Sequence, residues 1–280
     1  MWPVARPRFD AGDTFAICVS QIKNAILRRR LIAIRSNIEV AADDYAQKAE
    51  VGELYQVAQL RTIGVVPGVE LVKTYDNRMA KRGQPGRPIY DDIKLLPKGD
   101  RCPFCDNRNI STLDHILPKK RYPLFAVTPI NLVAACADCN KVKGEFAPTT
   151  ARETVLHPYF EDLSGQQWLS AEVVRQRPPA LIYRTIYVDE WDEVINARIA
   201  HQFALFGLAK LYSSHAAREI GDIRHNLQRH FEFGAAAAVK AELLRQWESR
   251  KANSLNSWQT AAYSALAESE WFCSGGFAED

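Results

Sequence analysis

Four of the six cysteines form two Cys-x-x-Cys pairs, a spacing that is typical of metal-binding thiolates. Cys102 and Cys105 make the first pair, and Cys136 and Cys139 make the second. Four thiolates close the coordination sphere of Zn²⁺, so a site of this kind is structural. A segment of about forty residues buries too little apolar surface to fold alone, and zinc would stabilise it by on the order of 10 kcal/mol.

The polar residues beside these pairs have the chemistry that phosphodiester hydrolysis requires. Asp114 precedes His115 in the run TLDHILP, and Asn140 directly follows Cys139. The side-chain oxygens of Asp114 and Asn140 are ligands that Mg²⁺ or Mn²⁺ prefers. His115 can accept a proton from an attacking water molecule. The alternative is an inactive zinc ribbon in which His115 is a packed histidine.

Basic residues follow both halves of this constellation. We expect them to contact the phosphates of a nucleic-acid backbone, and the alternative is a solvated charged face. The candidates for nucleic-acid binding are Lys119, Lys120, Arg121, Lys141 and Lys143.

In type, order and spacing these residues resemble the HNH endonuclease family. The matching positions are Asp114-His115, Asn131-Leu132 and Asn140, and many members of the family have histidine in place of this last asparagine. The resemblance implies a ββα-metal finger in which His115 is the general base and Asp114 and Asn140 hold one Mg²⁺ or Mn²⁺ ion. It implies that Asn131 orients the loop or the histidine, and that the products are 3′-hydroxyl and 5′-phosphate ends.

The segments that flank the module carry a second resemblance. The runs NRMAKRG and GRPIYDDI before it and LHPYFE after it are similar to HNH proteins of prokaryotic anti-phage loci, including the Septu and retron-linked nucleases. Some of those proteins act beside an ATPase. The resemblance implies a DNA endonuclease that works in defence with an ATPase partner.

Helices must position this module on both sides. Residues 14–62 have a helical pattern, with Leu27, Leu31, Ile34 and Ile38 on one face and a second helix over 39–62. Breakers in 64–88 predict a loop with room for a short helix, and IYDDIKLLP predicts a short helix or turn. The run LIYRTIYV, 181–188, predicts a strand, and the chain from 189 onward has helical patterns.

The predicted fold class is α+β and mainly α, with a small zinc-clamped ββα module between two helical regions. We place the N-terminal helical region at 1–88, the module at 89–160 and the C-terminal region at 161–280. Phe203, Phe206 and Tyr212 recur at helical spacing and predict core positions. We expect His157, Cys18 and Cys273 to be packed residues without a chemical role.

Composition sets limits on the remaining possibilities. The 280 residues are 47% hydrophobic and 25% charged, with a net charge of +3, as in an ordinary globular protein. The N-terminus lacks the apolar core of a signal peptide and no apolar run is long enough to span a membrane, so we expect a cytoplasmic protein. Two alternatives to a DNA endonuclease stay open: a nucleic-acid-binding or scaffold subunit with an inactive core, and an endonuclease for RNA, including tRNA. One site cuts one strand, so double-strand cleavage would need a homo-oligomer or a second encounter.

Overall fold

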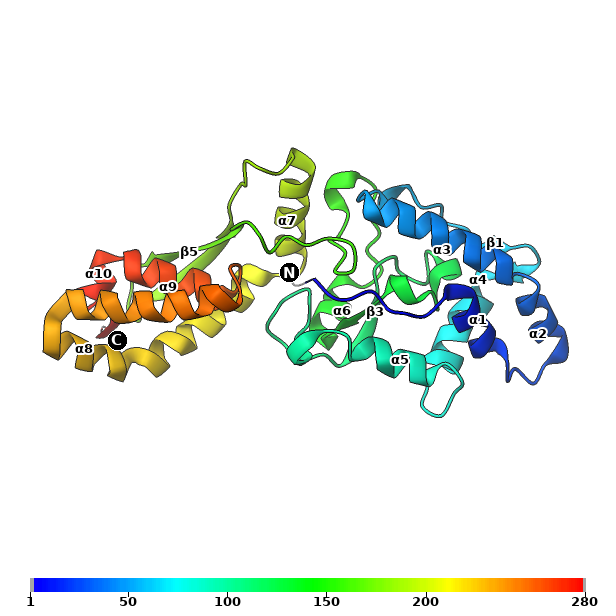
Figure 1. Ribbon diagram of the computed structural model, residues 1–280, viewed down its shortest axis with the longest axis horizontal. Coiled ribbons are helices and arrows are strands. Elements are labelled where there is room, and N and C mark those ends of the chain that lie inside the picture. Colours follow the sequence, from blue (N-terminus) through cyan, green and yellow to red (C-terminus); the bar gives the residue numbers. More distant parts are fainter. Residues whose placement is uncertain (1–2, 279–280) are drawn as a thin grey trace. The chain divides into compact units, whose positions relative to one another are not determined.

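The computed structural model describes residues 3–278 and divides the chain into two compact units (Figure 1). Unit 1 is Met1–Asp162 and unit 2 is Leu163–Asp280. Unit 1 therefore contains both the predicted N-terminal helical region and the predicted module, while unit 2 corresponds to the predicted C-terminal region. The predicted class is confirmed, because helices predominate and each sheet described has two strands.

Three helices open unit 1, where the sequence pattern over 14–62 predicted one helix followed by a second over 39–62. They are α1 (Ala11–Val19), α2 (Ala25–Ile32) and α3 (Arg35–Glu50). The break before α2 has a local cause, because the Asn24 side chain accepts a hydrogen bond from the Leu27 amide and starts a new helix. The predicted extension to residue 62 is wrong, since the chain turns at Gly52 with φ +72°. Leu31, Ile34 and Ile38 are buried as predicted, whereas Leu27 is only partly buried.

The segment with many breakers contains more regular structure than the predicted loop. A short hairpin of β1 (Thr62–Ile63) and β2 (Val66–Pro67) leads into α4 (Gly68–Thr74). A single turn of π-helix, Tyr75–Met79, continues α4. After a loop the chain enters α5 (Arg87–Lys94), the short helix that the sequence predicted. Turns of π-helix recur at functional sites, and this one carries Tyr75 toward the module.

A two-stranded sheet and one helix form the centre of the predicted module. The strands β3 (Thr112–His115) and β4 (Leu132–Ala135) are antiparallel, with Asp114 opposite Val133 and His115 opposite Leu132. Helix α6 (Ala137–Lys143) follows β4 directly. Every residue of β4 is buried, so the sheet lies inside unit 1. The order strand, strand, helix is the one that the resemblance implied.

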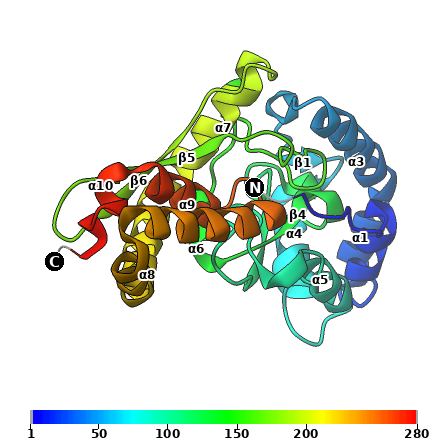
Figure 2. The same cartoon turned by 60° about the vertical axis from the view of Figure 1, so that its left-hand side comes forward.

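Unit 2 packs a hairpin against long helices (Figure 2). Its antiparallel strands are β5 (Leu169–Val174) and β6 (Ala180–Thr185), and β6 confirms the strand predicted at 181–188. The helices are α7 (Glu193–Leu205), α8 (Leu208–Asn253), α9 (Trp258–Glu268) and α10 (Glu270–Cys273). Strand β6 packs on α8 and β5 packs on α9. Phe203, Phe206 and Tyr212 are core residues, as predicted.

Helix α8 reverses direction within its length. The backbone leaves helical geometry at Gly234 and Ala235, and the two arms then run antiparallel. Arg250 Nη2 lies 3.4 Å from Glu219 Oε1 across the arms, and His230 Nε2 lies 3.9 Å from Glu242 Oε2 nearer the turn. Across residues 3–278, no helix combines the length and apolar character that crossing a bilayer demands.

Candidate functional site

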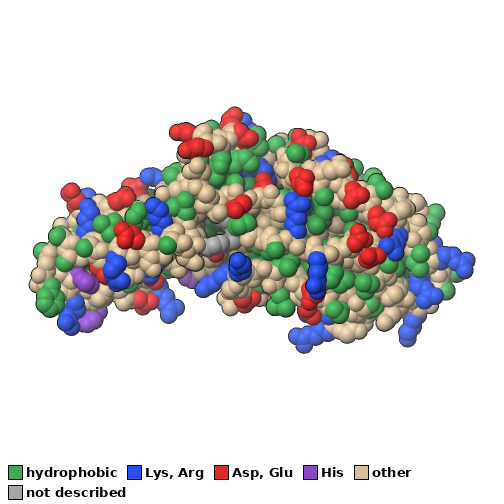
Figure 3. Space-filling view, in the orientation of Figure 1, with side chains coloured by type: hydrophobic (Ala, Val, Ile, Leu, Met, Phe, Trp, Pro, Cys, Tyr) green, Lys and Arg blue, Asp and Glu red, His purple; other side chains and the backbone are tan. Residues whose placement is uncertain are grey.

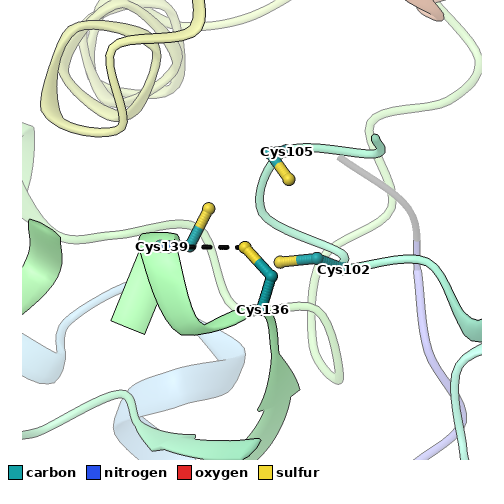
Figure 4. Close-up of side chains that lie close together, drawn as sticks. All are labelled: Cys102, Cys105, Cys136 and Cys139. Atoms are coloured by element: carbon teal, nitrogen blue, oxygen red, sulfur yellow. Dashed lines mark hydrogen bonds between the residues drawn. The ribbon is translucent and has the colours of Figure 1, made fainter. Parts of the chain in front are cut away.

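The four cysteines of the two pairs converge in unit 1 (Figure 4). Their sulfur atoms all lie within 4.8 Å of one another, and all four residues are buried. Cys102 and Cys105 come from a turn that the Asp106 amide closes onto the Cys102 carbonyl at 2.8 Å. Cys136 caps α6, where its Sγ accepts from the Cys139 amide at 3.4 Å. The cluster can therefore hold a structural metal ion such as zinc.

Hydrogen bonds among the thiols shift their pKa values in opposite directions. They lower the pKa of Cys105 to about 7 and lower that of Cys136 further, while they raise the pKa of Cys102 and Cys139. Such opposite shifts arise where some sulfurs are thiolates that accept hydrogen bonds from the others. A metal ion held by the four sulfurs would take the place of these protons.

His115 ends β3 with its imidazole buried. Nε2 lies 2.9 Å from the Ala126 carbonyl oxygen. Because a carbonyl oxygen only accepts, Nε2 carries the hydrogen and Nδ1 keeps its lone pair. Burial is the main cause that lowers the pKa of His115 to about 3, and the charge of Lys119 lowers it further. The imidazole is therefore neutral near pH 7 and is held in the tautomer that can accept a proton at Nδ1.

Asp114 lies next to His115 and has one carboxylate oxygen without a partner. Oδ1 accepts from the His115 amide at 2.7 Å and from Lys143 Nζ at 3.2 Å. Oδ2 is buried and has no hydrogen-bond partner among the described residues. Desolvation raises the pKa of Asp114, and the neighbouring ammonium of Lys143 opposes that shift. A buried anionic oxygen without a donor is a ligand position for a cation.

A pocket of about 280 Å³ brings three of the four predicted catalytic residues together. Asp114, His115 and Asn140 all line it, with Asn140 contributed by α6. Tyr75 also lines the pocket, and its ring packs edge-on against the His115 ring at 4.4 Å between centroids. Sequence reasoning missed Tyr75, because nothing in its spacing connects it to a motif some forty residues away.

Asn131 does not line the pocket but holds its walls. The side chain is fully buried, and Oδ1 accepts from the Leu117 amide at 2.8 Å. Nδ2 donates to the carbonyl oxygens of Leu117 at 3.0 Å and Phe125 at 3.1 Å. This role matches the predicted orientation of the loop that follows His115.

His157 is packed, as expected, and it contacts the segment between His115 and β4 that Asn131 also holds. Its side chain is buried, with Nε2 3.1 Å from Tyr45 Oη and 3.0 Å from the Ile130 carbonyl oxygen. Nδ1 accepts from the Tyr159 amide at 3.3 Å. Cys18 and Cys273 are buried thiols, also as expected.

The predicted phosphate contacts differ in their surroundings. Lys119 pairs with Asp76 at 2.6 Å and lies over the Tyr75 ring, and Lys120 pairs with Glu145. Both lysines line the pocket. Lys141 and Arg121 are exposed at the surface.

Lys143 departs from the prediction for this basic group. Its side chain is completely buried, and Nζ bonds to the His115 carbonyl oxygen at 2.6 Å as well as to Asp114. The ammonium lies beneath the pocket instead of facing solvent, because α6 turns this residue inward toward β3. Its observed partners are therefore Asp114 and His115, and the expectation of a surface phosphate contact is corrected.

Comparison with known proteins gives one informative similarity. The chain is 29% identical to Protein ea31 of Escherichia phage lambda, in an alignment of 227 residues that covers 76% of this chain and 76% of that protein. No protein-family model matches the sequence. No solved structure matches it either.

Proposed function

We propose that this protein is a metal-dependent HNH endonuclease that hydrolyses phosphodiester bonds in DNA. The observation that carries the proposal is the pairing of two groups in one pocket. His115 is neutral and held in a defined tautomer, and the neighbouring Asp114 has a buried carboxylate oxygen without a donor. A proton acceptor beside a cation ligand is the combination that hydrolysis of a phosphodiester requires.

The residues of the pocket divide the work of this reaction. His115 Nδ1 takes the proton of the attacking water, and the Ala126 carbonyl holds the ring so that this nitrogen stays available. Lys119 and Lys120 provide positive charge at the pocket wall for the phosphate. The phosphate charge also opposes the effect of Lys119 on His115, so substrate binding raises the pKa of the base toward a more effective value.

The pocket has oxygen atoms that can act as ligands of a hard divalent cation. Asp114 Oδ2 and the side-chain carbonyl of Asn140 would hold it, and both are oxygen ligands. When bound, Mg²⁺ or Mn²⁺ supplies positive charge to the phosphate oxygens and to the leaving oxygen. The four-cysteine cluster has sulfur ligands and would keep a separate zinc ion.

Plasmid cleavage tests the proposal directly. Wild type should nick supercoiled DNA with Mg²⁺ or Mn²⁺ and not with EDTA, while His115→Ala and the closer-sized His115→Asn should both lose this activity. His225→Ala, which removes a histidine from unit 2, should cut like wild type. Zinc content and circular dichroism should match wild type in each variant. Cleavage by a folded His115→Asn protein at the wild-type rate would refute the assignment of the base.

One observation favours an alternative, a nucleic-acid-binding or scaffold subunit with an inactive core. The Lys143 ammonium already contacts Asp114 and competes with a divalent cation for that carboxylate. Such a subunit would bind DNA equally well with Mg²⁺ or with EDTA and would yield no products. The same assays with RNA, including a tRNA, test the third candidate, an RNA endonuclease.

A role in anti-phage defence with an ATPase partner is a further part of this proposal. It is supported by the resemblance of the segments that flank the module. Co-purification of the tagged protein with products of neighbouring genes would test it, and recovery of an ATPase in stoichiometric amount is the expected result. Recovery of the protein alone, or only as a homo-oligomer, would contradict it.

A further inference from the structure

The loop of residues 80–86, between the π-helix and α5, forms part of the rim of the candidate pocket. Ala80, its first residue, lines the pocket together with Asp114 and His115. In Figure 1 this loop projects from unit 1 beside the start of α5, and Figure 3 shows Lys and Arg side chains at that edge of the unit. The loop therefore adjoins the pocket through Ala80.

Several hydrogen bonds close this loop into a defined shape. The Gly86 amide donates to the Arg78 carbonyl oxygen at 2.9 Å, and Arg78 Nη1 donates to Gln84 Oε1 at 3.0 Å. Arg87 Nη1 donates to the Ala80 carbonyl oxygen at 2.6 Å. These three hydrogen bonds thus hold the two ends of the loop together.

The base of the loop is also packed tightly against the core of unit 1. A Cβ atom at Gly86 would lie 2.5 Å from Cys18 Sγ and 3.0 Å from the Arg78 carbonyl oxygen. Only glycine allows the backbone to approach this closely. The loop therefore has a defined conformation next to the pocket.

The four cations of the loop and its ends fall into two pairs with different surroundings. Arg78 and Arg87 are partly buried and are used internally, with Arg87 also paired to Asp91 at 2.8 Å. Lys81 and Arg82 are exposed and make no hydrogen bond or ion pair with the described residues. The stretch from 78 to 87 contains no acidic residue. The nearest following carboxylate, Asp91, is paired with Arg87, and its pKa is lowered mainly by that hydrogen bond, with a smaller contribution from the charge of Arg82.

We propose that Lys81 and Arg82 bind backbone phosphates of the nucleic-acid strand that occupies the candidate pocket. The inference rests on the proposed function and extends it to a second phosphate site. Consecutive Cα atoms are about 3.8 Å apart, so both side chains leave the backbone within about 8 Å of Ala80. A strand advances about 3.4 Å along the duplex axis per nucleotide, so the loop contacts phosphates about one to three nucleotides from the reacting one.

Cations on a loop whose backbone is already held suit this role better than cations on a flexible segment. Ordering a long side chain costs conformational entropy, and a loop that is already closed adds no backbone cost when the strand binds. The contacts carry no base specificity, because phosphates are the same for every sequence. The loop therefore orients the strand and does not choose where it is cut.

Binding measurements across a salt series test the proposal apart from cleavage. The probes are one sequence as fluorescein-labelled duplex DNA, single-stranded DNA and RNA, measured by anisotropy in EDTA with His115→Asn as the parent protein. Lys81→Ala/Arg82→Ala should weaken duplex binding roughly 10- to 100-fold near 0.1 M salt and reduce the slope of log K against log salt by about 2. Comparison of the three probes identifies which nucleic acid the loop serves.

Two further variants serve as controls. Arg28→Ala/Arg29→Ala removes the same charge from exposed positions on α2 and should leave the slope within about 0.3 of the parent. Lys81→Arg/Arg82→Lys keeps the charge and should keep the slope. If the loop variant binds no more weakly than the α2 variant, or the parent binds none of the probes, the proposal is overturned. A loss of binding in a protein that never cuts DNA would instead uphold the loop site and reject the nuclease.

Discussion

Replacing Asn131 tests how the walls of the candidate pocket are held together. Its amide makes three hydrogen bonds, one from the Leu117 amide and two to the carbonyl oxygens of Leu117 and Phe125. These bonds fasten the segment that follows His115 to the start of β4. The residue is 0% exposed, so water cannot replace the bonds when the side chain is removed.

The expected loss follows from this count. A hydrogen bond contributes about 1 kcal/mol net, and a buried peptide group left without a partner costs about 1–3 kcal/mol. Asn131→Ala should therefore lower the free energy of unfolding of unit 1 by about 3–5 kcal/mol, a large share of the roughly 5–15 kcal/mol typical of a domain. Asn131→Asp keeps the acceptor but loses both donated bonds and places a carboxylate against two carbonyl oxygens, so we expect at least as large a loss.

Unit 2 provides a matched control for this prediction. Asn256 Oδ1 accepts from the Trp168 amide at 2.8 Å and the Leu169 amide at 3.3 Å, and its Nδ2 donates to the Gln166 carbonyl oxygen at 2.8 Å. Hydrogen exchange resolved by segment should show faster exchange over 112–135 for Asn131→Ala and over 166–185 for Asn256→Ala. Urea unfolding supplies the free energies. A loss below about 1 kcal/mol for Asn131→Ala, or equal exchange in both units, would refute the reasoning.

The other predictions concern the cysteine cluster, two glycines and the charge beside Asp114. Cys136→Ser should lose the bound zinc and expose 101–144 to protease, whereas retained stoichiometric zinc would contradict a four-cysteine site. Gly86→Ala should lower the melting temperature, because the added Cβ would clash with the buried thiol of Cys18. Gly221→Ala serves as the control: Gly221 is exposed in α8 with open space around it, so alanine there should raise stability by up to about 1 kcal/mol. Mn²⁺ should bind more tightly when uncleaved DNA is present. Lys143 already balances the charge of Asp114, so an added divalent ion needs the negative charge of a phosphate. Equal Mn²⁺ affinity with and without DNA would contradict this prediction.

Local signals in the sequence predicted the cysteine cluster and the main pocket residues. The features that the sequence did not predict depend on helix capping and on contacts between distant segments. The cysteine spacing and the order of Asp114, His115 and Asn140 were sufficient to predict residues that now share a cluster and a pocket. The break before α2 was missed because Asn24 caps a new helix without disturbing the apolar period. Strand β5 was missed because most of its residues are only partly buried, so it lacks the apolar pattern of its partner β6.

Tyr75 could not be predicted for a different reason. Its place against His115 depends on how α4 and the π-helix pack on the module, and no motif spacing reports such packing. The same limit applies to the loop of residues 80–86. Its basic composition is visible in the sequence, but the division into structural and exposed cations appears only when their partners are known.

Lys143 shows most clearly how burial changes the meaning of a charge. In the sequence it is one of several cations near the motif. In the fold it lies three residues after Asn140 on α6 and contacts Asp114, while Asn140 lines the same pocket as Asp114. The ammonium on Oδ1 opposes the rise that burial causes in the pKa of Asp114, and Oδ2 has no hydrogen-bond partner among the described residues. A divalent ion added there brings excess positive charge, which a substrate phosphate would offset. Under the proposed function, this arrangement would favour binding of metal and nucleic acid together over binding of metal alone. In a binding subunit with an inactive core, Asp114 would instead pair with Lys143 only.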